Sequence, residues 1–415
     1  MGPMLIFDKS FLESLNPDEA VWLDHFFPTC ITPLFFIETL ADLEKEVRRG
    51  RTPEQVVGGI AYKTPDMQSH VNPLHTSLLI SELVAGQEVA MDARIRRAGG
   101  EVVQLNDQQG MVYRMSKEEE AFNRWQRREF LDLERQIAKV WRLSVSGLDY
   151  SGAYTLFNKL YGSIRKPKTL KDAKEIADSL IDLFQEEISL RFGMSLLNVP
   201  TALHRTVVNR WADLGKPPIN KFAPYFRYMY TVELFFYLAI GADLISRVRP
   251  ENKADNKVDI AYLYYLPFCK VFASSDNLHE RTAPLFLRED QTFVKGPLLK
   301  AGLTKLDVHF DALPQDVKAK GLHAFAADPP LDDSFFVTRL WDRHVPDWRK
   351  ESAERKELSP EAQKALIELV NLISKEAQPV ELSEPPKISD LQYIHVSRQI
   401  LPKKGKWMRV PPNAL

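Results

Sequence analysis

Residues 253–280, KADNKVDIAYLYYLPFCKVFASSDNLHE, combine a short helix, a buried strand and two aspartates in one stretch. Apolar residues follow Asp259 at helical spacing, and Pro267 then ends the helix because proline disfavours helical geometry in the residue before it. The segment at 270–273 is short, apolar and strand-forming, as expected for a covered strand of a parallel sheet. The stretch therefore predicts a helix carrying Asp259, a strand, and Asp276 just beyond the strand's carboxyl end.

A similar arrangement of strand and acid opens the chain. MLIFDKSF predicts an apolar strand that ends in Asp8, and PTCIT at 28–32 predicts a second short strand. Thr32-Pro33 then begins a helix that holds Glu38 among large apolar residues. Open α/β sheets bind ligands at the carboxyl ends of their strands. A fold that joined the two stretches would bring four acids to this edge: Asp8, Glu38, Asp259 and Asp276. Four acids in one place repel one another unless they share a cation.

The order of these acids resembles that of PIN-like nuclease domains. Such domains place an Asp at the end of the first strand, a Glu in the helix after the second, an Asp opening a late helix, and an Asp after the next strand. Asp8, Glu38, Asp259 and Asp276 match these positions, and Ser274 falls where the family commonly has Ser or Thr. The resemblance covers roughly 4–48 and 199–295. It implies an α/β fold with a mostly parallel central sheet flanked by helices, and one or two Mg²⁺ or Mn²⁺ ions that activate a water to cleave RNA.

The separation between Glu38 and Asp259 is far longer than a compact PIN-like domain needs, which predicts a large insertion. The expected organisation is a discontinuous α/β core over 1–48 and 199–300, a mainly helical insertion over 49–198, and a C-terminal extension over 301–415.

Two amphipathic segments of the expected insertion predict its helices. The first, at 116–143, opens with a capping box in which Ser116 and Glu119 satisfy each other's backbone amides, and the second spans 170–192. The sequences EVVQL and MVYRM at 101–115 flank a turn and predict a small hairpin.

Composition limits how the chain can bind nucleic acid. The 415 residues carry a formal net charge of −1, which argues against bulk electrostatic capture and requires a local basic patch for any RNA contact. Two loops offer such a patch: Arg94, Arg96 and Arg97 in one, and Arg165, Lys166 and Lys168 in the other. The first is equally consistent with a solvated loop, and the second fits a solvated linker slightly better than a phosphate contact. The segment 403–409, KKGKWMR, interleaves cations with one tryptophan, a pattern suited to single-stranded RNA.

Cysteine content and hydropathy predict a cytoplasmic protein that does not enter a membrane. Cys30 and Cys269 are too few for a disulfide framework, so a reducing compartment is the simpler expectation. The opening MGPMLIF lacks the basic segment of a signal peptide. The most hydrophobic run, 222–245, contains Arg227, Glu233 and Asp243, which favours a buried helix over a transmembrane one.

Several single residues have competing interpretations. His70 and His75 flank Asn72-Pro73, where no helix can continue, and no Glu completes a zinc pattern, so a metal role is the weaker interpretation. Glu233 fits a buried salt bridge, with Arg227 as a candidate partner, better than a fifth site carboxylate. Asp255 lies one helical turn before Asp259 and is its rival, although the apolar face begins directly behind Asp259.

An all-oxygen ligand set selects Mg²⁺ or Mn²⁺ over zinc. The sequence therefore predicts metal-assisted phosphodiester hydrolysis, with Asp8, Asp259 and Asp276 as ligands, Glu38 as a ligand or orienting the attacking water, and Ser274 in support of Asp276. No P-loop, GxGxxG or GxSxG motif supports a nucleotide-driven or serine-hydrolase reaction. The alternative is a PIN-like scaffold that binds RNA, a protein partner or a second copy through its helical insertion without cleaving anything. The choice between RNA and DNA stays open.

Overall fold

The computed structural model describes most of the chain. The described residues are 2–41, 43, 50–94, 100–106, 108–129, 131, 136, 165–183, 186–245, 253–355, 359–380, 393–396 and 400–409. Within these ranges, no helix has both the length and the apolar character needed to cross a membrane. Two predicted features lie outside them: the basic residues Arg96 and Arg97, and most of the helix expected beyond residue 129.

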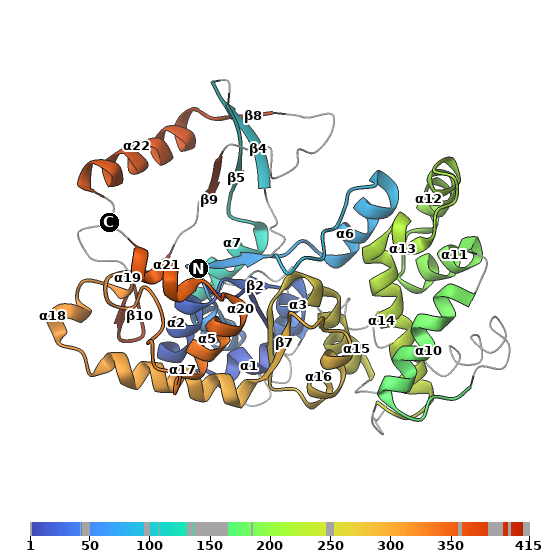
Figure 1. Cartoon of the computed structure of the whole chain (residues 1–415), viewed down its shortest axis with the longest axis horizontal. Helices are drawn as coiled ribbons and strands as arrows, with labels where there is room; N and C mark the ends of the chain where they lie inside the picture. Colours follow the sequence, from blue (N-terminus) through green and yellow to red (C-terminus); the bar gives the residue numbers. More distant parts are fainter. Residues whose placement is uncertain are drawn as a thin grey trace.

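Five parallel strands form the central sheet (Figure 1). In spatial order they are β3 (Ser69–Val71), β2 (Thr29–Ile31), β1 (Leu5–Phe7), β6 (Val271–Ser274) and β7 (Thr292–Lys295). β1 and β6 pair directly, with Leu5 opposite Val271, so the two stretches that carry the predicted acids are neighbours in the sheet. The predicted α/β class with a parallel central sheet is confirmed.

The chain builds this sheet outward from β1 in two directions. β2 and β3 follow β1 on one side, whereas β6 and β7 lie on the other. The strand order therefore reverses between β1 and β6. In open parallel sheets, such a reversal opens a crevice at the carboxyl ends of the two strands, and ligands bind there.

The strand β3 was not anticipated from the sequence. It lies within 49–198, the range assigned to a helical insertion, yet it pairs with β2 at the edge of the central sheet. Its residues, Ser-His-Val, lack the apolar run that predicts a covered strand. Pairing with β2, with Cys30 opposite His70, fixes it in the sheet instead.

Alternate residues of the strands face opposite layers of helices. Ile6 and Phe272 belong to one core, and Leu5 and Val271 to the other. The first core includes residues of α6 (His75–Ile80), η1 (Ser81–Ala85), α10 (Leu170–Leu183), α11 (Glu186–Leu196), α12 (Thr201–Asp213), α13 (Ile219–Phe222), α14 (Pro224–Gly241), α15 (Lys253–Tyr262), η3 (Leu263–Phe268) and η4 (Ala283–Leu285), with α16 (Asn277–Thr282) packed against it.

The second core is built by helices from the two ends of the chain. It includes residues of α1 (Lys9–Ser14), α2 (Pro17–Phe26), α3 (Pro33–Ala41), α5 (Pro53–Lys63), α7 (Lys117–Gln126), α17 (Gly296–Asp311), α19 (Leu322–Phe325), α20 (Phe336–His344) and α21 (Trp348–Glu354), and α18 (Gln315–Lys318) lies between α17 and α19. The expected capping box at Ser116 and Glu119 is present at the start of α7.

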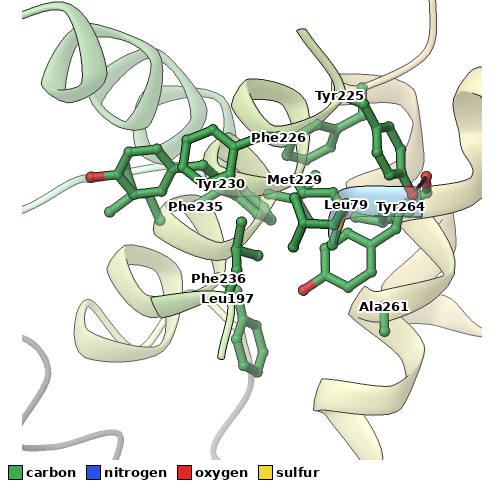
Figure 2. Packing of buried hydrophobic residues seen from close by; sticks show 14 of the residues in the cluster. Leu79, Leu197, Tyr225, Phe226, Met229, Tyr230, Phe235, Phe236, Ala261 and Tyr264 are labelled. Carbon is green, nitrogen blue, oxygen red and sulfur yellow. Dashed lines mark hydrogen bonds between the residues drawn. The ribbon is translucent and has the colours of Figure 1, made fainter. Parts of the chain in front are cut away.

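The helix α14 is the buried helix predicted over 222–245. Its aromatic residues, among them Phe226 and Tyr230, pack into the first core (Figure 2). Glu233 is buried within this helix and forms an ion pair with Lys257 of α15. The salt-bridge interpretation of Glu233 is therefore confirmed, with Lys257 as the partner in place of Arg227.

A second sheet of four short strands stands apart from the central one (Figure 1). Its order is β8 (Gln378–Pro379), β4 (Gly100–Leu105), β5 (Gln108–Tyr113) and β9 (Tyr393–Val396), and α22 (Pro360–Glu376) packs against it through Ile373. β4 and β5 are antiparallel, with Gly100 opposite Tyr113, which confirms the predicted hairpin.

Residues 400–409, the C-terminal clasp, fold back onto the N-terminal helices through the small hairpin of β10 (Lys403–Lys404) and β11 (Trp407–Met408). Arg409 is fully buried and lies 2.7 Å from the Asp24 carboxylate. The Lys404 ammonium, also fully buried, donates to the Thr64 carbonyl at 2.7 Å. Arg409 and Lys404 are therefore held within the fold, whereas Lys403 is exposed, and binding of single-stranded RNA by this segment stays a prediction.

Candidate active site at the carboxyl edge of the sheet

One register row across the central sheet is entirely polar. The row before it, at the carboxyl ends of the strands, is apolar and consists of Val71, Ile31, Phe7, Ala273 and Val294. The next residue along each strand gives, in spatial order, Asn72, Thr32, Asp8, Ser274 and Lys295. Polar groups thus collect at the edge where the strand reversal opens the sheet.

Asp8 is buried at the centre of this row, and both of its carboxylate oxygens accept hydrogen bonds. It is the N-cap of α1, where its Oδ1 accepts from the Phe11 amide at 2.9 Å. Its Oδ2 accepts from the Ser10 hydroxyl at 2.8 Å and from the Ser274 hydroxyl at 2.5 Å. The last of these bonds links the two sequence-remote stretches directly.

His279 completes the network around Asp8. Its Nε2 lies 2.7 Å from the Asp259 carbonyl, which can only accept, so Nε2 carries a proton. Its Nδ1 lies 2.8 Å from Ser274 Oγ, whose single proton is already donated to Asp8. Nδ1 must then donate as well, which makes the ring an imidazolium. Burial lowers the pKa of His279, but the hydrogen bond and charge of Asp8 outweigh burial and raise this pKa to about 9.

The same network sets the charge of Asp8. Burial raises the pKa of its carboxyl, whereas the hydrogen bond and charge of His279 and the bond from Ser274 lower it, and the result lies below the ordinary value. Asp8 and His279 therefore form an internal ion pair at neutral pH.

Ser274 serves as a link within this network, not as a nucleophile. Its hydroxyl donates to Asp8 and accepts from His279, and it also accepts from the Asp276 backbone amide at 3.0 Å. The side chain is buried, and no hydrogen-bonding position is left for a substrate. The expected support of Asp276 exists through the backbone, while the side chain of Ser274 fixes Asp8.

Glu38 lies on α3 beside the network, and the pKa of its carboxyl is strongly raised. Tyr262 of α15 donates its hydroxyl to Glu38 Oε2 at 2.8 Å, and Oε1 has no hydrogen-bond partner among the described residues. Burial raises the pKa of Glu38, Lys9 lowers it, and the charges of Asp259 and Asp8 raise it further, to about 8. Three of the four predicted acids are thus close enough to influence one titration.

Asp259 and Asp276, the remaining two acids, are half-buried and more exposed than Asp8. Asp259 is half-buried on α15, where its charge acts on Glu38 and its carbonyl holds His279. Asp276 is the N-cap of α16 and its Oδ1 accepts from the Leu278 amide at 2.5 Å. Its Oδ2 has no hydrogen-bond partner among the described residues. The side chain of Asp255 lies outside the described part of the structure.

The donor chemistry of this edge fits a hard divalent cation. Glu38 Oε1 and Asp276 Oδ2 are carboxylate oxygens without a hydrogen bond in the described part of the chain. No three His, Cys, Asp or Glu side chains within the described ranges are grouped closely enough to hold one metal ion. Mg²⁺ nevertheless binds commonly through one or two carboxylates with waters completing its shell. The edge therefore fits a largely hydrated ion better than one enclosed by protein ligands.

The basic residues expected to contact nucleic acid are exposed and already have acidic neighbours. Arg94 pairs with Asp92, and Arg165 pairs with Asp172. The Lys166 ammonium lies 3.9 Å from Asp243, and Lys168 is exposed, with its backbone amide bonded to Asp172. The ion pairs among these contacts lie at the surface, where water screens charge and such pairs contribute little to stability.

The two histidines considered for metal binding lie apart from these acids. His75 Nδ1 lies 3.2 Å from the Tyr265 hydroxyl, and burial, followed by the charge of Lys257, lowers its pKa to about 3. His70 lies within β3 at the edge of the sheet. The structure brings neither into a group of metal-ligating side chains within the described ranges.

Sequence reasoning missed several residues of this edge. Lys9 is buried next to Glu38, and Tyr262 donates a hydrogen bond to it. In the sequence, neither residue differs from an ordinary helix residue. Thr32 and Asn72 are buried, and their side-chain polar atoms have no hydrogen-bond partner in the described structure. Each is the first polar residue after an apolar strand position, the signal that had identified Asp8.

Comparison of the sequence with protein-family models and with curated proteins, and of the fold with solved structures, found no match.

Proposed function

We propose that the protein is a Mg²⁺- or Mn²⁺-dependent endonuclease that hydrolyses phosphodiester bonds in RNA at the carboxyl edge of its central sheet. The observation that carries this proposal is the pKa of Glu38, raised to about 8 by burial and by the charges of Asp259 and Asp8. Acids held in mutual repulsion destabilise a fold, and a bound cation would relieve that repulsion.

Glu38 and Asp276 are the residues that would contact the ion, because each has a carboxylate oxygen without a hydrogen bond in the described structure. Asp259 adds a third carboxylate nearby. When bound, a divalent ion lowers the pKa of a coordinated water and stabilises charge on the scissile phosphate. Tyr262 holds Glu38 Oε2, which leaves Oε1 as the atom that loses its proton when Glu38 ionises.

Asp8 has a positioning role in this proposal. Its charge is balanced by His279, and its oxygens are held by Ser274, Ser10 and the Phe11 amide. The negative charge of Asp8 therefore raises the pKa of Glu38, while Asp8 keeps its own hydrogen bonds. Substrate would approach from the open side, where Ser275 is exposed and Asp276 and Asp259 are half-buried.

A catalytically silent scaffold is the second candidate. The internal ion pair of Asp8 with His279 favours it, because the fold already supplies a cation to the most buried acid. In this case the protein binds RNA or a partner protein and no ion is required.

Thermal unfolding with and without Mn²⁺ separates the two candidates. An ion at a hundredfold excess over its Kd stabilises the folded state by about 2.7 kcal/mol, which raises the Tm of the metal-dependent protein by a few degrees. In Asp276→Asn this gain disappears while the helix cap is kept, because Asn caps helices as well as Asp does. The matched control is Asp332→Asn in an exposed turn, where Asp332 Oδ1 accepts from the Ser334 amide.

Cleavage of labelled RNA in the same buffers completes the test. The nuclease cuts RNA only with Mn²⁺ or Mg²⁺. Asp276→Asn loses at least about tenfold of this activity, because even a residue that only supports a metal ligand commonly accounts for about 10–100-fold. An unchanged Tm in Mn²⁺ together with intact RNA rejects the nuclease, and RNA retention in a gel-shift assay then supports the scaffold.

A further inference from the structure

A cleft of about 430 Å³ opens between α10, the first half of α14 and residues 285–287. α10 and α14 run side by side (Figure 1) and form its two walls. Small-molecule sites commonly measure about 300–1,000 Å³ and are mostly apolar with a few polar groups. This cleft has that character, and its described lining includes none of the four acids of the carboxyl edge.

Aromatic rings form one part of the lining. Tyr228 and Phe286 meet edge to face with ring centres 6.3 Å apart, and Phe235 supports Phe286 from the core at 5.1 Å. The ammonium of Lys174 lies 5.2 Å above the centre of the Phe286 ring. The ammonium of Lys174 therefore covers one face of Phe286, a ring that is only 8% exposed.

Two cations stand at the rim, each with an exposed acidic partner. Lys174 lies 2.6 Å from Asp178, and the Arg227 guanidinium donates to both oxygens of Asp182 at 2.9 Å. The two acids are 41% and 67% exposed, whereas Lys174 and Arg227 are 21% and 24% exposed. Both cations are partly buried, so an anionic ligand must replace the carboxylates with equivalent charge-assisted hydrogen bonds.

From this combination we propose that the cleft binds a nucleoside monophosphate unit. Lys174 moves from the Phe286 ring to the phosphate, which it holds together with Arg227, and the base takes the place of the ammonium on Phe286. Stacking on an aromatic ring accepts any base, since every base has a π face. The phosphate supplies charge-assisted bonds to a guanidinium and an ammonium. Asn220, an exposed residue of the lining, offers an amide to the edge of the base. The unit is either a free nucleotide or part of an RNA strand.

Nucleotide binding in this cleft is independent of the proposed nuclease activity, because the binding needs no divalent ion. The test is isothermal titration in buffer containing a chelator, with adenosine 5′-monophosphate as the ligand and with adenosine and inorganic phosphate as its separate parts. Saturable binding of the monophosphate, at least tenfold tighter than of either part, is the expected result. Absence of saturable binding at millimolar concentration overturns the proposal.

Variants locate the binding. Arg227→Gln and Lys174→Met are each expected to weaken binding of adenosine 5′-monophosphate by about tenfold or more, the effect of losing a charged hydrogen bond. The matched controls are Arg191→Gln and Lys171→Met, which alter similar ion pairs on α11 and α10 with residues that do not line the cleft. Equal loss in the variants and their controls contradicts the assignment of the site.

The source of the ligand follows from a second titration with a six-nucleotide oligoadenylate. Binding at least tenfold tighter than that of the mononucleotide identifies a segment of an RNA strand. Equal binding identifies a free nucleotide or a strand end. Both results retain the proposed chemistry, whereas binding of the oligonucleotide that is insensitive to Arg227→Gln and Lys174→Met rejects the cleft as its site.

Discussion

Replacing Glu38 by glutamine should stabilise the protein, and the gain should grow with pH. Glutamine keeps an oxygen that can accept from Tyr262, but it has no proton to lose. In the unfolded chain the carboxyl ionises with its ordinary pKa of 4.5, whereas in the folded protein burial and the charges of Asp259 and Asp8 raise this pKa to about 8. The folded state thus binds a proton that the unfolded state releases between these two values.

The size of the effect follows from linkage between protonation and folding. A group whose pKa is raised on folding favours the folded state fully below its unfolded pKa, and this advantage is lost as pH rises toward the folded value. Relative to glutamine, the penalty of Glu38 is about 1 kcal/mol near pH 5, about 3 kcal/mol near pH 7 and roughly 4–5 kcal/mol near pH 8.5. These values are upper limits, because Glu38 is only half-buried and water screens part of its charge.

Urea unfolding of the wild type and Glu38→Gln near pH 5, 7 and 8.5, in buffer with a chelator, measures this difference. The control is Glu175→Gln on α10, whose side chain is 64% exposed and whose effect should stay within about 0.5 kcal/mol. A Glu38→Gln difference that is constant across the three conditions would refute the raised pKa of Glu38 on which the proposed function rests.

Two further perturbations test the charges that hold the fold together. His279→Gln should lower the free energy of unfolding by about 3 kcal/mol near pH 6, and this loss should shrink as pH rises from 6.5 to about 9. The reason is that the wild-type imidazolium stabilises the fold fully below pH 6.5 and loses its proton as pH passes 9. A loss in urea unfolding that does not depend on pH would contradict this. Arg409→Met should cost about 3–5 kcal/mol by leaving Asp24 buried without its cation, whereas Lys403→Met, at an exposed position of the same hairpin, should cost under about 0.5 kcal/mol. Equal losses in these two variants would show that the clasp is held by something other than this ion pair.

Much of the central sheet could be predicted because its strands carry strong local signals. β1, β2 and β6 are short apolar runs followed by a polar residue. The start of α7 was equally local, since the capping box at Ser116 needs only residues three positions apart. Patterns of this range do not depend on the rest of the fold.

The features that were missed depend on partners far away in the sequence. The cations of the C-terminal clasp read as a basic tail, because the acid that neutralises Arg409 lies at Asp24. β3 is a strand only because β2 lies beside it. The charge of His279 follows from Asp8 and Ser274, and no local pattern contains that information.

Two acids beside β1, the buried Asp8 and the half-buried Glu38, differ in how their charge is balanced. Asp8 has a complete set of donors and an imidazolium, so its charge is part of what joins β1 to β6. Glu38 has one hydrogen bond, and its neighbours Asp8 and Asp259 oppose its ionisation. Selection for stability alone would favour glutamine at this position, because it keeps the bond and removes the penalty. Residues that destabilise a fold in this manner are concentrated at functional sites, and Glu38 is therefore the residue at which stability and activity should change in opposite directions.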